Sequence, residues 1–297
     1  MLSSTDNAYM YSYLKRLFND FIFGNLFIAL CAVGMVFSTF LMNGLQICLT
    51  PFTVFITMAT YLLYNFHRFS FKLNFYDLKK LKFSARGIII KPMEKGCYII
   101  SSIVMIGSVF LLHQSIFPFL FPLALLTLSY SIPFIKVKNN KIRLSEIPIV
   151  KTPVLALVWG LSTTIIPLVE QNISLSSSFI WLQVISRSLF IFALCIPFEI
   201  RDLAADKSKN IRTLPVIYGI KTTKIIGMLI VFLEIITHHL MPVISVSSII
   251  ALDISSLVAL LWIIRRDYTT GIYFYKFLVD GTMLVRFVFL FIAIHQI

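Results

Sequence analysis

Three acidic residues with helical spacing are the feature of this sequence that most directly suggests chemistry. Glu199, Asp202 and Asp206 are three and four residues apart, so a continuous helix places their carboxylates on one face. Like charges at such a distance repel one another, and a bound cation relieves the repulsion. Mg²⁺ takes one or two carboxylates and completes its shell with water and phosphate oxygens. The pattern therefore predicts that Asp202 and Asp206 hold Mg²⁺, that Glu199 supports them, and that a diphosphate is the partner of the ion.

Cationic residues accompany these acids. Arg201, Lys207 and Arg212 would neutralise a diphosphate as it leaves, which stabilises charge that develops in the transition state. The alternative is a solvated helix end in which acids and bases four residues apart simply pair, and a bare Asp-x-x-x-Asp arises often by chance. Two features favour a site: the acids follow a long apolar segment, and a Thr213-Leu-Pro helix start comes soon after them.

Long apolar segments must position these residues. The chain is 58% hydrophobic and 13% charged, which is too apolar for one soluble core, so lipid must solvate much of it. Segments long enough to span a bilayer are residues 21–42, 47–66, 97–112, 116–135, 148–169, 179–198, 225–243, 246–264 and 277–294. We expect an all-α, polytopic membrane bundle of about nine transmembrane helices in a single domain, residues 1–297.

The loop cations predict how the chain is oriented in the membrane. Lys and Arg occur before the first segment and in the loops after the second, fourth, sixth and eighth, while the other loops carry none. Because cytoplasmic loops are rich in Lys and Arg, the amino terminus is predicted inside and the carboxyl terminus outside. The net charge of +13 then reflects topology and not nucleic-acid binding, for which no recognition motif is present. We expect an integral protein of a bacterial inner (cytoplasmic) membrane.

The acidic segment and the residues after it resemble a known motif. Asp202-x-x-x-Asp206, followed by the sequence Ile-Arg-Thr-Leu-Pro-Val at 211–216 and by Gly219, is similar to the second Asp-rich motif of the UbiA family of intramembrane prenyltransferases. The residues at 130–134 and 156–160 resemble the family's fourth and fifth helices, and the likeness extends over nearly the whole chain.

This resemblance implies a helical bundle with a central cavity open to the cytoplasmic side. It implies that two Asp-rich motifs hold a Mg²⁺–diphosphate, that the allylic C–O bond of a polyprenyl diphosphate ionises, and that an aromatic or other lipid-soluble acceptor traps the carbocation. Aromatic side chains would shelter that cation with their π faces. The partners implied are thus a polyprenyl diphosphate, its acceptor and membrane lipids.

The family's first Asp-rich motif is the main departure. Asn65 stands where that motif would begin and is expected to be a site residue, but Phe66, Phe69 and Leu73 occupy the positions of its aspartates. As a replacement, Asn65 shares one helical face with Arg68 and Lys72. We hypothesise that Arg68 and Lys72 bind the diphosphate opposite a single Mg²⁺. The alternative is that both cations merely reach the membrane interface.

Loss of one metal site leaves open a catalytically silent homologue that binds polyprenyl lipid. Charges inside the apolar segments leave open a membrane transporter, although no inverted repeat is evident. We expect those charges to form ion pairs between helices, Arg187 with Glu234 or Asp253. The adjacent His238 and His239 are expected on different helix faces.

Overall fold

The computed structural model describes residues 4–72, 92–132, 135–137, 140–147, 149–208, 211–242, 244–265 and 271–295. The helices are α1 (Ser4–Phe23), α2 (Leu26–Met42), α3 (Pro51–Lys72), α4 (Pro92–Leu111), α5 (Phe117–Ser131), α6 (Lys151–Glu170), α7 (Ser178–Ser208), α8 (Leu214–His239), α9 (Val246–Ile264) and α10 (Asp280–His295). Shorter elements are the 3₁₀ turns Gln114–Ile116 and Leu144–Glu146, the antiparallel strands β1 (Ile135–Val137) and β2 (Asn140–Ile142), and a π-helical turn, Phe274–Val279, that runs into α10. The predicted all-α bundle is confirmed, with one short hairpin between α5 and α6.

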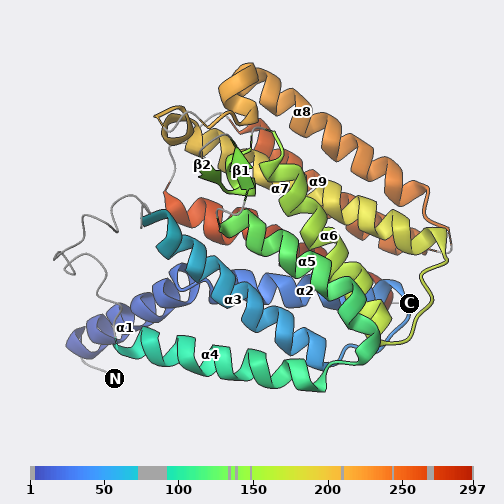
Figure 1. The fold of residues 1–297 in the computed structure, drawn as a ribbon, viewed down its shortest axis with the longest axis horizontal. Helices are drawn as coiled ribbons and strands as arrows, with labels where there is room; N and C mark the ends of the chain where they lie inside the picture. The colour runs from blue at the N-terminus through green and yellow to red at the C-terminus, as the bar shows by residue number, and fades with distance from the viewer. Residues whose placement is uncertain are drawn as a thin grey trace.

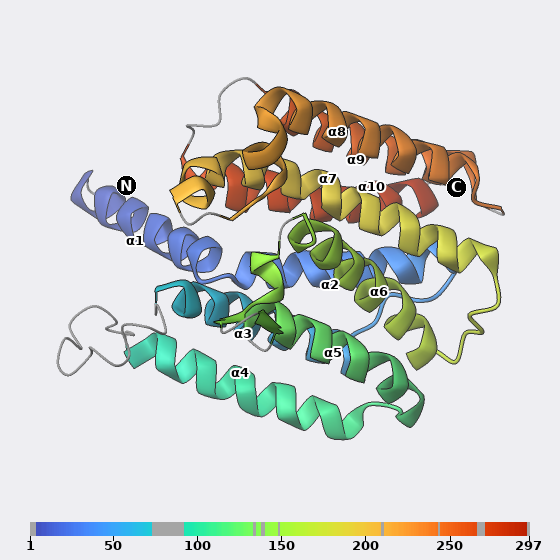
Figure 2. The ribbon, with the colours of Figure 1, turned by 45° about the horizontal axis from the view of Figure 1, so that its top comes forward.

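The long helices lie side by side, with α8 at one edge of the bundle and α4 at the opposite edge (Figure 1). Helix α2 contacts α3, α6 and α10, while α7 contacts α6, α8 and α9. Because α6 contacts both α2 and α7, these three helices connect α3, which packs on α2, with α8, which packs on α7. The start of α1 and the end of α10 lie at opposite ends (Figure 2), as an odd number of membrane crossings requires. Which end faces the cytoplasm stays a prediction.

Each of the nine predicted segments corresponds to one helix from α2 to α10, but the predicted number of spans is not confirmed. Within the described residues, α6 to α9 and the segment 274–295 are long and apolar enough to cross a membrane, which makes 5. Two bent pairs raise the number to 7 if each pair is one span: α1 with α2 at 60° and α4 with α5 at 104°. The protein is an integral membrane protein, with nine crossings still a prediction.

The first predicted span is wrong in its start. The sequence predicts one helix over residues 21–42, whereas α1 ends at Phe23 and α2 begins at Leu26. Asn25 between them has a left-handed backbone with φ of 65°, which breaks the helix. The break turns α1 away from the axis of α2 and places the Asn25 side chain among the polar residues described below.

Small residues let the central helices approach one another closely. A methyl group built on Gly160 of α6 would stand 2.1 Å from Ser188 Oγ and 3.0 Å from the carbonyl oxygen of Val184, both on α7. Glycine therefore permits a backbone approach that any other residue would prevent. Beside this contact, Trp159, Phe190 and residues of α2 form a buried core. This core packs α6 and α7 against α2.

Candidate functional site

A cavity of about 300 Å³ lies between the α1–α2 break, α3, α5, α6, α7 and the start of α10. We call it the charged cavity, because among the described residues three acids and three cations line it: Lys151, Glu199, Arg201, Asp202, Lys276 and Asp280. Asn25, Tyr64, Tyr130 and Thr152 add polar groups to its wall. Such a mixture of opposite charges in one concave site suits a ligand that carries both a cation and an anion.

Helix α7 supplies two of the three acids. As predicted, α7 continues past the apolar segment to Ser208, so Glu199, Asp202 and Asp206 share one helix. Glu199 is only 5% exposed and accepts a hydrogen bond from Thr152 Oγ1 through Oε1. Asp202 accepts a bidentate pair from Arg201, with Nε 2.7 Å from Oδ1 and Nη2 2.9 Å from Oδ2. Asp206 is buried one turn further on and does not belong to the described wall of the cavity.

On α7, two of the buried carboxylate oxygens are left without a hydrogen bond from the described part of the chain. They are Glu199 Oε2 and Asp206 Oδ2, on either side of Asp202 along α7. A buried acceptor without a donor costs free energy, so such oxygens are the kind a bound cation would satisfy. No group of three or more His, Cys, Asp or Glu side chains in the described ranges is placed to hold a metal ion. An ion bound to these oxygens would therefore take at most two carboxylates here and obtain its other ligands from water or phosphate.

Arg201 is held in place by aromatic rings as well as by Asp202. Its guanidinium carbon lies 5.0 Å from the ring centroid of Phe198 and 4.7 Å from that of Tyr275. Stacking against two rings orients the planar guanidinium at the cavity wall. Of the three cations predicted near the acids, the structure brings only Arg201 to the cavity. Lys207 is exposed in the last turn of α7, and Arg212 is exposed just before α8.

Four residues of this wall are not predicted as site residues by the sequence: Asn25, Lys151, Lys276 and Asp280. Lys276 Nζ donates a hydrogen bond to Asn25 Oδ1 at 2.8 Å, which joins the π-helical turn to the α1–α2 break. From the sequence, Lys151 and Lys276 are predicted only to be loop cations that set the membrane topology. The spacing of four between Lys276 and Asp280 indicates that both share one helical face, as the same spacing does for Asp202 and Asp206 of α7.

Asn65 has a positioning role in the structure. It is 2% exposed, and its amide donates to the carbonyl oxygens of Gly24 at 3.0 Å and Tyr61 at 2.8 Å. Its Oδ1 accepts from Asn25 Nδ2 at 3.1 Å and from the Tyr98 hydroxyl at 3.2 Å. An amide has two donors and two lone pairs, so these four bonds use its whole capacity. Asn65 thus ties α3 to the α1–α2 break, and its neighbour Asn25 reaches the cavity instead.

Arg68 and Lys72 lie in the last turns of α3, but their side chains fall outside the described part of the structure. Their predicted contact with a diphosphate stays a prediction.

An apolar cavity of about 490 Å³ adjoins the charged one. Residues of α2, α3, α4, α5 and α6 line it, among them Phe55, Leu63, Leu123 and Trp159. Tyr64 lines both cavities. The site therefore has a charged compartment and an apolar compartment that share Tyr64 in their walls.

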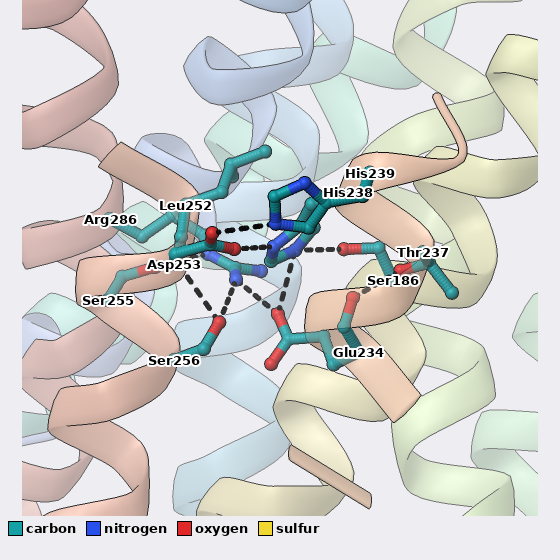
Figure 3. Close-up of polar contacts among 10 residues, drawn as sticks. All are labelled: Ser186, Glu234, Thr237, His238, His239, Leu252, Asp253, Ser255, Ser256 and Arg286. Atoms are coloured by element: carbon teal, nitrogen blue, oxygen red, sulfur yellow. Dashed lines mark hydrogen bonds and ion pairs between the residues drawn. The ribbon is translucent and has the colours of Figure 1, made fainter. Parts of the chain in front are cut away.

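A separate polar cluster is buried among α7, α8, α9 and α10 (Figure 3). Arg286 makes an ion pair with Glu234, and at most 2% of either residue is exposed. Arg286 also donates from Nε to Ser255 Oγ at 2.9 Å and from Nη2 to Ser256 Oγ at 3.1 Å, and it lies 3.6 Å from the centre of the Phe190 ring. These contacts offset the cost of burying a charge in the membrane.

The predicted partners inside the membrane are therefore wrong in detail. Glu234 pairs with Arg286, and Asp253 with His238 and His239. Arg187 bonds instead to Thr39 and to the carbonyl oxygen of Thr163, the latter at 2.7 Å. Which helix faces meet decides the partner, and α7 turns Arg187 toward α2 and α6.

The two histidines do differ in direction, since His238 is buried and His239 is exposed. Each nevertheless reaches one oxygen of Asp253, at 2.8 Å for His238 and 3.1 Å for His239. His238 Nε2 also lies 2.9 Å from Ser186 Oγ, so the order Ser186–His238–Asp253 is that of a hydrolytic triad. Ser186 is only 3% exposed, and Glu234 lies 3.3 Å from the same ring nitrogen. A substrate has no access to this serine, and we interpret the cluster as structural.

These observations define a class of protein: a membrane protein built as a helical bundle, with a charged cavity next to an apolar one. The model of the UbiA prenyltransferase family matches residues 94–279, and the chain belongs to this family. The resemblance inferred from the motif is thereby confirmed.

Two solved structures share the fold. One, described as digeranylgeranylglyceryl phosphate synthase in membranes, has a TM-score of 0.58 at 13% identity and covers 93% of this chain and 98% of its own. The other, a UbiA homolog from Archaeoglobus fulgidus, has a TM-score of 0.56 at 13% identity over 92% of this chain and 96% of its own. No curated protein matches the sequence significantly. At such identity the likeness shows the fold alone.

Proposed function

We propose that this protein is a Mg²⁺-assisted prenyltransferase that moves a polyprenyl group from its diphosphate to an aromatic or other lipid-soluble acceptor. The observation that carries the proposal is the pair of cavities that meet at Tyr64. A polyprenyl diphosphate has the same division, with a highly charged head and a long apolar tail. The head would lie among the six charged residues and the tail among the side chains of α2 to α6.

The ion would be held by the acids of α7. Asp202 lies in the cavity wall, and the unpartnered oxygens of Glu199 and Asp206 flank it on the same helix. These residues fit Mg²⁺, which needs only one or two carboxylates when phosphate oxygens complete its shell. When bound, the ion neutralises negative charge on the departing diphosphate.

Cationic side chains would bind the diphosphate and stabilise it as it leaves. Lys151, Arg201 and Lys276 line the same cavity from three different elements, so they can surround an anion. When the allylic C–O bond breaks, its electron pair leaves with the diphosphate, and these cations stabilise the charge that develops there. The carbocation remains on the prenyl chain beside Tyr64, whose π face stabilises positive charge. The acceptor then donates an electron pair to the carbocation and releases a proton.

Diphosphate release by the purified protein in nanodiscs tests this proposal. With farnesyl or geranylgeranyl diphosphate and Mg²⁺, the wild type should release diphosphate, and Asp202→Asn should reduce the rate at least about a hundredfold because an electrostatic stabiliser is lost. Asp20→Asn, which removes an exposed acid from α1, is the matched control and should keep the wild-type rate.

Two outcomes would contradict the proposal. Binding of the donor without release of diphosphate by the wild type would identify a catalytically silent lipid-binding homologue. Movement of an intact substrate across the membrane would identify a transporter.

A further inference from the structure

The acids of the charged cavity come from two walls. Helix α7 contributes Glu199 and Asp202, and the start of α10 contributes Asp280. Helix α3, which also borders the cavity through Tyr64, has no Asp or Glu anywhere in its sequence. Any carboxylate that faces the α7 acids from another wall of the described cavity is therefore that of Asp280.

The backbone that carries Asp280 is fixed against α2. Cys31 Sγ donates to the carbonyl oxygen of Asp280 at 3.4 Å. A methyl group on the next residue, Gly281, would stand 3.2 Å from the ring of Phe27, so α10 begins in close contact with α2. The Asp280 side chain thus enters the cavity from a rigid support.

Lys276 is held in the same wall. It belongs to the π-helical turn Phe274–Val279, and such turns are frequent at functional sites. Its ammonium group donates to Asn25 at 2.8 Å, one of the contacts that keep it at the cavity. Lys276 and Asp280 are four residues apart, so an anion site and a cation site stand side by side on one wall.

The acids of α7 need a further ligand from another wall to surround a cation. Each oxygen of Asp202 accepts one hydrogen bond from Arg201 and keeps a second lone pair, while one oxygen of the buried Glu199 accepts no hydrogen bond from the described residues. A free carboxylate oxygen on one wall and a carboxylate on another are suitable ligands for one hard cation. The cations around them would then contact phosphate oxygens.

We propose, on the basis of the proposed function, that the π-helical turn Phe274–Val279 and the start of α10 form the second half of the diphosphate site. Asp280 is a ligand of the divalent cation from the α10 wall, and Lys276 binds the oxygens of the diphosphate. The last helix thus supplies the carboxylate that α3 lacks.

Binding of inorganic diphosphate to the nanodisc-embedded protein tests the assignment without any turnover. Affinity is measured by calorimetry with Mn²⁺ and again with EDTA, and bound Mn²⁺ is followed by electron paramagnetic resonance. Asp280→Asn should weaken diphosphate binding about tenfold with Mn²⁺, because a charged ligand is lost, but should leave it equal or tighter with EDTA. Lys276→Gln should weaken binding about tenfold under both conditions. Asp280→Glu should restore part of the Mn²⁺-dependent affinity.

Two further variants serve as controls, and three results would each contradict a stated part of the reasoning. Asp20→Asn controls for the loss of one negative charge, and Asp280→Ser is a second variant in case Asp280→Asn does not fold. If the wild type shows no Mn²⁺-dependent binding, the proposed function fails. If Asp202→Asn loses that binding while Asp280→Asn behaves like Asp20→Asn, only the present inference fails. Tighter binding by Asp280→Asn under both conditions would show that Asp280 merely neutralises Lys276, which also overturns it.

Discussion

The ion pair between Glu234 and Arg286 gives the sharpest prediction of stability. Glu234 is 0% exposed and Arg286 is 2% exposed, so Glu234→Gln keeps the shape of the side chain but leaves a buried guanidinium without its counter-charge. Removing one partner of a buried pair costs about 3–5 kcal/mol. Arg286 keeps its bonds to two serine hydroxyls and its contact with the Phe190 ring, so we expect the lower end of this range, about 3 kcal/mol.

The assay is reversible unfolding by SDS in mixed micelles, analysed as a double-mutant cycle with Arg286→Met. Each single variant should lose about 3 kcal/mol of unfolding free energy, and the double variant should lose much less than the sum, because both charges leave together. Lys221→Gln, an exposed site on α8, is the control and should change stability by less than about 0.5 kcal/mol. Additive losses, or a loss below about 1 kcal/mol for Glu234→Gln, would refute the claim that this pair is buried and coupled.

Three further predictions concern the site and its frame. Asn65→Ala should cost about 1–3 kcal/mol of unfolding free energy, because each of its four partners loses a hydrogen bond, two of them buried and two part-buried; chemical unfolding measures this, and an unchanged midpoint would contradict the positioning role. Gly160→Leu should destabilise by at least about 1–3 kcal/mol because Ser188 blocks the side chain, and a wild-type melting temperature would refute the close approach of α6 and α7. Ala59→Phe should fill part of the apolar cavity and reduce kcat/KM about tenfold for geranylgeranyl diphosphate but less for a shorter donor; equal losses for both donors would place the tail elsewhere.

Much of the helical architecture is readable from the sequence. The nine apolar segments correspond to α2 through α10, because a bilayer requires each crossing segment to satisfy its own backbone hydrogen bonds. The break at Asn25 is not readable in the same way. Residues 21–42 form one apolar run, and the left-handed conformation at Asn25 is stabilised by the contacts of its side chain with Asn65 and Lys276, residues that are distant in sequence.

Some residues of the candidate site can likewise be predicted from the sequence, and others cannot. Glu199 and Asp202 could be found from their spacing, because side chains three residues apart on one helix share a face whatever the tertiary fold. Lys151 and Asp280 lie on other helices, and only the packing of α6 and α10 around α7 brings them to the same cavity. The structure likewise gives Asn65, which the motif suggested as a site residue, a set of bonds that fills its hydrogen-bonding capacity.

By itself the sequence determined the membrane class, the α7 acids and the family, because apolar length and local spacing act within single helices. The tertiary structure alone decided which helix faces meet. It paired Glu234 with Arg286 and not with Arg187, since a buried charge is stabilised by the partner that packing brings within reach. It also joined a charged cavity to an apolar one at Tyr64, a junction between helices that no local pattern encodes.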